Sequence, residues 1–178
     1  DYLVHYKNLK NEKIVAEITP SYLYSETAAE NIYQYNPDAK LIAIFRNPVD
    51  YVESIHKLLY LNSIEYIPNL IDAIKVCKTR DKSHYRQSKK EKKEITNYYN
   101  RIKYAEQINR YLNLFDKKNI LVLFYEDFRD NNQIVLDKIC DFLSIDKILI
   151  EQKLNINTSK KTKIRFIMNL KNTKVVNF

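Results

Sequence analysis

The chain has 178 residues, carries a formal net charge of +8 and contains no glycine. Its length predicts a single domain over residues 1–178, and no run approaches the roughly 20 apolar residues that a membrane-spanning helix needs. The first residues lack the basic and apolar regions of a signal peptide, and Cys77 and Cys140 suggest no metal or disulfide framework. We therefore expect a cytoplasmic protein with two reduced thiols and no metal.

Short, continuously apolar segments alternate along the chain with segments of helical periodicity. We expect strands at residues 13–18, 40–45 and 119–124. We expect helices at residues 1–10, 22–35, 48–62, 67–77, 94–115, 132–143 and 164–170. Asn47 is a predicted N-cap, followed by Pro48 at the first helical position. The charged residues 78–94 predict an exposed loop, and residues 147–178 form a basic C-terminal segment.

This alternation indicates an α/β fold of three layers, in which helices flank a mainly parallel sheet. In such folds the ligand lies at the carboxyl ends of the strands. Each predicted strand ends in a polar corner, and function is expected at these corners. Their sequences are EITPS at residues 17–21, RNP at residues 46–48 and YED at residues 125–127.

The second corner has the residue types of a phosphate site. Arg46 follows a buried strand, so its guanidinium is expected to face the ligand crevice, where it grips phosphate bidentately. The free N–H groups of the following helix add positive potential, and the Ser54 hydroxyl, eight residues after Arg46, supplies another donor. The alternative is that Arg46 pairs with a surface carboxylate and that Ser54 has no special role.

Three ordered segments resemble sulfotransferases that use 3′-phosphoadenosine-5′-phosphosulfate (PAPS). KLIAIFRNPVDYVESIH is similar to the family's 3′-phosphate-binding segment, in which a Ser follows Arg-Asn-Pro. AEITPSYLYSETAAENIYQYNPDAKLI resembles the preceding segment of bacterial and glycan-type members. NILVLFYEDFRDNNQIVLDKICDFLSI is similar to the Tyr-Glu-Asp strand and the helix after it. The resemblance covers most of residues 13–145 and implies a P-loop-nucleotide-binding-like sulfotransferase fold.

The resemblance assigns roles where residues match. Arg46 and Ser54 are expected to hold the 3′-phosphate, and Tyr125 is expected near the adenine, with a strand-capping core tyrosine as the alternative. A basic loop is expected to close over the nucleotide, although a merely solvated tail is an equal alternative. Its residues are Asn157, Ser159, Lys160, Lys161, Lys163 and Arg165.

Glu17 is the candidate catalytic residue, as a general base or as a group that orients the acceptor. Glycan-type members have a Lys directly after this Glu, whereas this chain has Ile18. That departure weakens the transfer of a catalytic role to this corner. The cytosolic members' catalytic His is not recognisable among the three histidines.

The family also begins with a strand and a loop that cradles the 5′-phosphosulfate. Such loops use glycine to bring backbone N–H groups close to phosphate oxygens, and nothing before Lys13 resembles one. We therefore expect an N-terminally incomplete domain, inactive by itself. In that picture the absent strand lies between the strands at 40–45 and 119–124, which are left with unpaired edges.

The leading hypothesis is sulfuryl transfer from PAPS, as co-substrate, to a hydroxyl or amine acceptor, with a glycan as the first expectation. A second hypothesis is a non-catalytic remnant that binds adenosine 3′,5′-bisphosphate. A third, a basic nucleic-acid-binding domain, lacks any recognisable motif. We thus expect a sulfate acceptor as partner and no nucleic acid.

Overall fold

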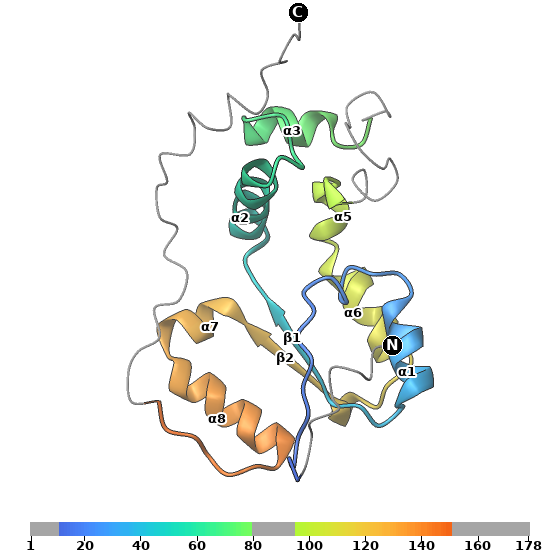
Figure 1. The fold of residues 1–178 in the computed structure, drawn as a ribbon, viewed down its shortest axis with the longest axis vertical. Helices are drawn as coiled ribbons and strands as arrows, with labels where there is room; N and C mark the ends of the chain where they lie inside the picture. The colour runs from blue at the N-terminus through green and yellow to red at the C-terminus, as the bar shows by residue number, and fades with distance from the viewer. Residues whose placement is uncertain (1–10, 80–94, 151–178) are drawn as a thin grey trace, which may run out of the picture.

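The computed structural model describes residues 11–79 and 95–150 (Figure 1). The elements in chain order are α1 (Ala28–Tyr35), β1 (Leu41–Phe45), α2 (Pro48–Leu61), α3 (Leu70–Val76), α5 (Tyr98–Arg101), α6 (Tyr104–Leu112), the 3₁₀ turn η3 (Lys117–Asn119), β2 (Ile120–Phe124), α7 (Tyr125–Asp130) and α8 (Asn132–Leu143). The helices expected at residues 1–10 and 164–170, most of the charged loop and the basic residues from 157 onward lie outside the described residues.

The two strands pair directly and in parallel. Leu41 lies opposite Ile120, and the register continues to Phe45 opposite Phe124. The expectation that a further strand separates β1 from β2 is therefore wrong, because each strand satisfies the facing backbone groups of the other. Within the described part of the chain the sheet has these two strands.

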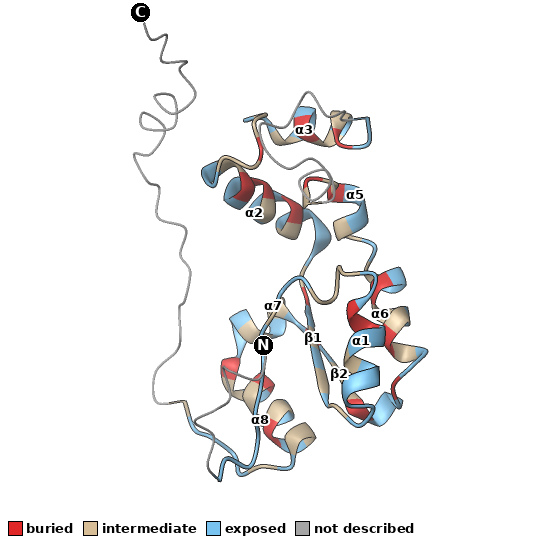
Figure 2. Ribbon diagram, turned by 45° about the vertical axis from the view of Figure 1, so that its right-hand side comes forward, coloured by how far each residue is buried: buried red, intermediate tan, exposed pale blue. Residues whose placement is uncertain are grey.

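Helices cover both faces of this sheet, which confirms the three-layer α/β arrangement. Figures 1 and 2 show α1 and α6 on one side of the strands and α7 and α8 on the other. On the first side Tyr111 and Phe115 are buried with Ala29 and pack against Leu41 and Ile120 of the strands. Burial of side chains of this size stabilises the fold by about 1.5–3 kcal/mol each.

The strand expected at residues 13–18 is not formed. The segment is irregular and exposed, and Ile18 is 89% exposed. A turn follows, in which the Tyr22 N–H donates to the Thr19 carbonyl over 3.1 Å. The apolar residues of this segment predict a strand. A strand forms, however, only where a neighbouring strand satisfies its backbone N–H and carbonyl groups.

A second cluster packs α2 against α3 and α5, above the sheet in Figure 1. Its buried members are Val52, Leu59, Ala73, Cys77 and Tyr98. The Glu65 carboxylate, 1% exposed, is also enclosed here and accepts hydrogen bonds from the Tyr98 hydroxyl and from the Tyr66 and Ile67 N–H groups. These bonds offset the cost of burying a carboxylate.

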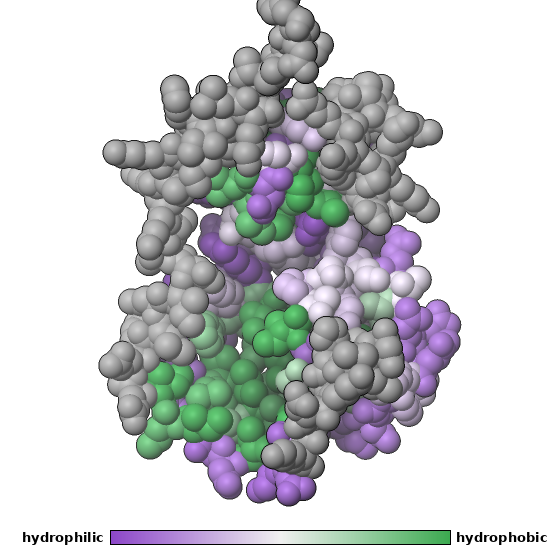
Figure 3. Space-filling view, viewed as in Figure 1, coloured by the Kyte–Doolittle hydropathy of each residue, from purple (hydrophilic) through white to green (hydrophobic). Residues whose placement is uncertain are grey.

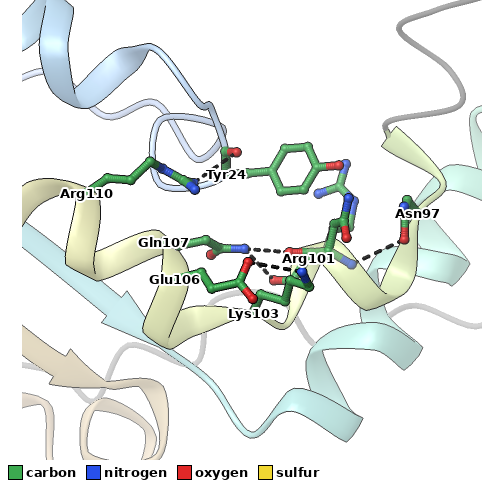
Figure 4. A network of polar contacts seen from close by, with 8 residues as sticks. Tyr24, Asn97, Arg101, Lys103, Glu106, Gln107 and Arg110 are labelled. Atoms are coloured by element: carbon green, nitrogen blue, oxygen red, sulfur yellow. Dashed lines mark hydrogen bonds and ion pairs between the residues drawn. The ribbon is translucent and has the colours of Figure 1, made fainter.

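The single helix expected at residues 94–115 is two helices, α5 and α6, with a break at Ile102 and Lys103. The Gln107 amide stabilises the break, because its Nε2 donates to the carbonyls of Asn100 and Arg101 (Figure 4). Carbonyls at the end of a helix fall outside its regular bonding pattern, and that of Asn100 also accepts the Lys103 N–H. Helical periodicity alone does not reveal such a break.

Several apolar side chains of the strands remain partly exposed. They are Ile42, Ile44, Val122 and Phe124. Figure 3 shows apolar residues gathered over the strands and α8 in the lower half of the molecule. The carboxyl ends of β1 and β2, which lead into polar residues, lie above this patch in the view of Figure 1.

Candidate functional site

Arg46 and Tyr125 meet at the carboxyl end of the sheet. They are the residues that directly follow the paired Phe45 and Phe124, so the parallel register brings them together. The Arg46 Cζ lies 4.9 Å from the centroid of the Tyr125 ring, in a cation–π contact. The Arg46 Nε is buried and has no hydrogen-bond partner among the described residues. A buried, unpaired and permanently charged donor is suited to an anionic ligand.

A hydrogen bond joins the two corners. The Asn47 N–H donates to Glu126 Oε1 over 2.9 Å, across 79 residues of sequence. This bond, and then the one from the N–H of Glu126 itself, lower the pKa of the Glu126 carboxyl below its usual range, and the charges of Arg129 and Arg46 add to the effect. Glu126 is therefore a carboxylate at neutral pH.

The start of α2 offers a ligand fewer amide donors than the sequence suggests. Asn47 is the N-cap, as expected, and its side chain accepts the Val49 N–H over 2.9 Å. Pro48 has no N–H, and the Asn47 N–H is engaged by Glu126. The expectation of freely available N–H groups at this corner is wrong for these three residues. A ligand at this corner would therefore meet side chains, above all Arg46, rather than these backbone amides.

Ser54 lies exposed on α2, two turns beyond the cap. Its spacing from Asn47 is seven residues, which places both on one face of the helix, about 10 Å apart along its axis. The neighbouring Glu53 has a lowered pKa, mainly because it bonds Lys57, with a smaller effect from the Arg46 charge. The Arg46 guanidinium is thus close enough to this turn of α2 to act on it electrostatically.

Aromatic rings line the corner beneath Arg46. The Tyr104 ring lies 4.8 Å from Phe45 and 6.3 Å from Tyr51, measured between centroids. Burial raises the pKa of Tyr104 to about 12, with smaller contributions from Tyr51 and Glu126. Tyr104 therefore stays protonated and remains a hydrogen-bond donor throughout the physiological range.

Glu17 lies in the exposed segment before α1. Its Oε1 accepts hydrogen bonds from the Thr19 hydroxyl over 2.8 Å and from the Tyr22 hydroxyl over 2.6 Å. The two donors hold the carboxylate in place within a local turn. Thr19 and Tyr22 were not singled out from the sequence, although both belong to the segment that resembles the family.

Side chains of α5 and α6 contact the turn that follows Glu17. The Tyr111 hydroxyl donates to the Tyr22 carbonyl over 2.8 Å, and the Arg110 guanidinium donates to the carbonyls of Leu23 and Tyr24. The Arg101 guanidinium lies 5.0 Å from the Tyr24 ring centroid (Figure 4). No sequence pattern predicted these long-range contacts.

The structure therefore brings together two of the predicted site residues, Arg46 and Tyr125, and adds Glu126 and Tyr104, which were missed. Glu126 belongs to the Tyr-Glu-Asp corner, so the rule that strand ends meet was the signal for it. The candidate residues from Asn157 to Arg165 lie outside the described residues.

A family model described as the sulfotransferase domain matches residues 7–177. The chain belongs to the sulfotransferase family. The membrane-associated sulfotransferase kil1 of Dictyostelium discoideum is 25% identical over 214 aligned residues, which cover 80% of this chain and 45% of the relative. The chain thus spans less than half the length of this curated relative.

A solved structure is also similar to this sulfotransferase domain. It is a sulfotransferase from Alicyclobacillus acidocaldarius, with a TM-score of 0.73 and 24% identity over 88% of this chain and 61% of that one. The likeness confirms the expected sulfotransferase fold. Among the residues that the structure describes, no helix is long and apolar enough to cross a bilayer.

Proposed function

We propose that this sulfotransferase domain takes its sulfuryl group from PAPS and binds the 3′-phosphate through Arg46. The observation that carries the proposal is the guanidinium at the joint end of β1 and β2. It is held on the Tyr125 ring, and its buried Nε has no hydrogen-bond partner within residues 11–79 and 95–150. Ser54 is the proposed second donor, since it lies on the face of α2 that begins at the same corner.

Tyr125 is proposed to lie beside the adenine and to support Arg46. Its ring already contacts the guanidinium, so its replacement is expected to weaken phosphate binding as well as base binding. Ser159, Lys160, Lys161 and Arg165 are proposed to complete the site from the basic C-terminal segment, by resemblance to the family.

Glu17 is the proposed general base. Sulfuryl transfer requires that an acceptor hydroxyl or amine lose its proton as it attacks sulfur, and a positioned carboxylate accepts such a proton. The bonds from Thr19 and Tyr22 fix the carboxylate but leave the assignment to be tested. A glycan is the first acceptor to test. We place the reaction in the cytoplasm, as the free and buried Cys77 and Cys140 favour.

Binding of adenosine 3′,5′-bisphosphate and of AMP, measured by calorimetry, tests the donor site. The two ligands differ in the 3′-phosphate, so the unmutated protein is expected to prefer the bisphosphate. Arg46→Ala is expected to lose about ten- to a hundredfold in affinity for the bisphosphate, the range for a charge-assisted contact. Arg129→Ala is the matched control. It removes the same charge as Arg46→Ala, but from an exposed arginine that pairs with Asp130. Equal affinity for the two nucleotides in the unmutated protein overturns the proposal.

A second candidate is a domain that binds the bisphosphate without catalysing transfer. The residue after Glu17 favours it, because this chain has Ile18 where glycan-type members have a Lys. Radiolabelled sulfate transfer to a phenol and to glycans separates the candidates. Tight bisphosphate binding without any transfer supports the second.

A further inference from the structure

Glu126 occupies an unusual position for a carboxylate beside a proposed phosphate site. It is partly exposed, follows Tyr125 at the end of β2, and its negative charge acts on Arg46. By charge alone such a group repels an anionic ligand and weakens its binding. A role that compensates for this repulsion must come from its other contacts.

The hydrogen bond from Asn47 supplies that role. The bond connects the residue after Tyr125 with the residue after Arg46, so it joins the same two strand ends as the cation–π contact. Asn47 is also the cap of α2, whose side chain bonds Val49 and whose carbonyl accepts the Tyr51 N–H. One carboxylate thereby fixes the backbone that aims Arg46 and the helix that carries Ser54.

We propose that Glu126 is a positioning residue for nucleotide binding, which holds the Arg46–Asn47–Pro48 turn by accepting the Asn47 N–H. The inference rests on the proposed function of Arg46 as the 3′-phosphate ligand. Its effect comes from the acceptor oxygen and not from the charge. The opposite possibility is that Glu126 competes with the ligand. In that arrangement the phosphate needs the Asn47 N–H and must displace the Glu126 carboxylate to reach it.

Two substitutions separate these arrangements. Glu126→Gln keeps an acceptor oxygen and removes the charge, whereas Glu126→Ala removes both. For a positioning residue, Glu126→Ala is expected to lower the affinity for adenosine 3′,5′-bisphosphate about two- to tenfold, the range for an ordinary hydrogen bond. Glu126→Gln is expected to keep or slightly raise that affinity. If Glu126 instead competes with the phosphate for the Asn47 N–H, both substitutions are expected to tighten binding.

Glu53→Ala is the matched control. Glu53 also lies within the electrostatic reach of Arg46, but it bonds Lys57 and not the corner. Its removal is expected to raise bisphosphate affinity by no more than about twofold, because exposed charges are screened. A loss of affinity in Glu53→Ala equal to that in Glu126→Ala overturns the positioning role.

The ratio of bisphosphate to AMP affinity is the readout that a merely structural role does not move. It is expected to fall in Glu126→Ala and to persist in Glu126→Gln, in protein whose cooperative thermal unfolding has been verified. Amide hydrogen exchange of Asn47, measured by NMR without ligand, is expected to accelerate in the Ala variant alone.

The outcomes distinguish the two proposals. Equal binding of both nucleotides by the unmutated protein overturns the 3′-phosphate site itself. A strong preference for the bisphosphate that survives Glu126→Ala unchanged overturns the role of Glu126 alone. If Glu126→Ala fails to fold, Glu126→Gln decides, because a loss of affinity in that variant contradicts the role of the acceptor oxygen.

Discussion

The two proposed halves of the site are built in different ways. Arg46 and Tyr125 are fixed by strands that pair residue by residue, and Glu126 bonds across the same junction. Glu17 lies in an exposed segment without regular structure, and side chains of α6 bond the carbonyls of Tyr22 and Leu23 in the turn that follows. Strand pairing therefore fixes the positions of the residues proposed to bind the nucleotide. The position of the proposed base depends instead on a few separate hydrogen bonds. Variants of the two halves should accordingly affect binding and turnover separately.

Glu17→Gln is expected to have the largest effect of the variants proposed here, and its effect is on kcat. If Glu17 is the general base, kcat falls by about 10²–10⁴-fold, because the amide cannot accept the acceptor's proton. Nucleotide affinity is expected to stay unchanged, since Arg46 is untouched. Steady-state kinetics of sulfate transfer, together with calorimetry of the bisphosphate, measures both. Near-normal turnover returns Glu17 to a structural role.

Tyr22→Phe is expected to have an intermediate effect. It removes the shorter of the two hydroxyl bonds to Glu17 and keeps the aromatic ring. A misplaced base is expected to cost about tenfold in kcat, the equivalent of one hydrogen bond. Tyr35→Phe is the control, because Tyr35 is 72% exposed on α1. Equal losses in both variants argue against a specific contact with Glu17.

Tyr111→Phe is expected to have the smallest effect, and it should change the stability of the fold and not the turnover. Burial raises the pKa of Tyr111, so its hydroxyl is a donor at neutral pH and bonds the Tyr22 carbonyl. Loss of this bond is expected to lower the free energy of unfolding by about 0.5–1.5 kcal/mol, measured by urea denaturation. A stability equal to that of the unmutated protein shows that water replaces the bond.

Much of the sheet and its flanking helices could be predicted from the sequence. The apolar runs at β1 and β2, the Asn47-Pro48 start of α2 and the span of α8 all lie within a residue of their expected positions. These features depend on local chemistry, such as capping, periodicity and strand composition. Arg46 and Tyr125 could be paired for the same reason, once the strands were known to be parallel.

The remainder depended on contacts between distant residues. Residues 13–18 have the composition of a strand but gain no neighbour, and the break between α5 and α6 is set by Gln107 reaching back to two carbonyls. The hydrogen-bond partner of Glu126 is a backbone N–H 79 residues earlier in the chain. Local patterns carry no information about such partners.

The separation of Asn47 from Glu126 also has a consequence for how the protein folds. Closure of a loop of 79 residues costs several kcal/mol of chain entropy before any contact offsets it, and parallel strand pairing is slow for the same reason. The corner therefore cannot assemble from either half of the chain. During synthesis it forms only after β2 and α7 have left the ribosome, when α2 and α3 have long been available. The proposed nucleotide site therefore forms late in synthesis, once β2 has paired with β1.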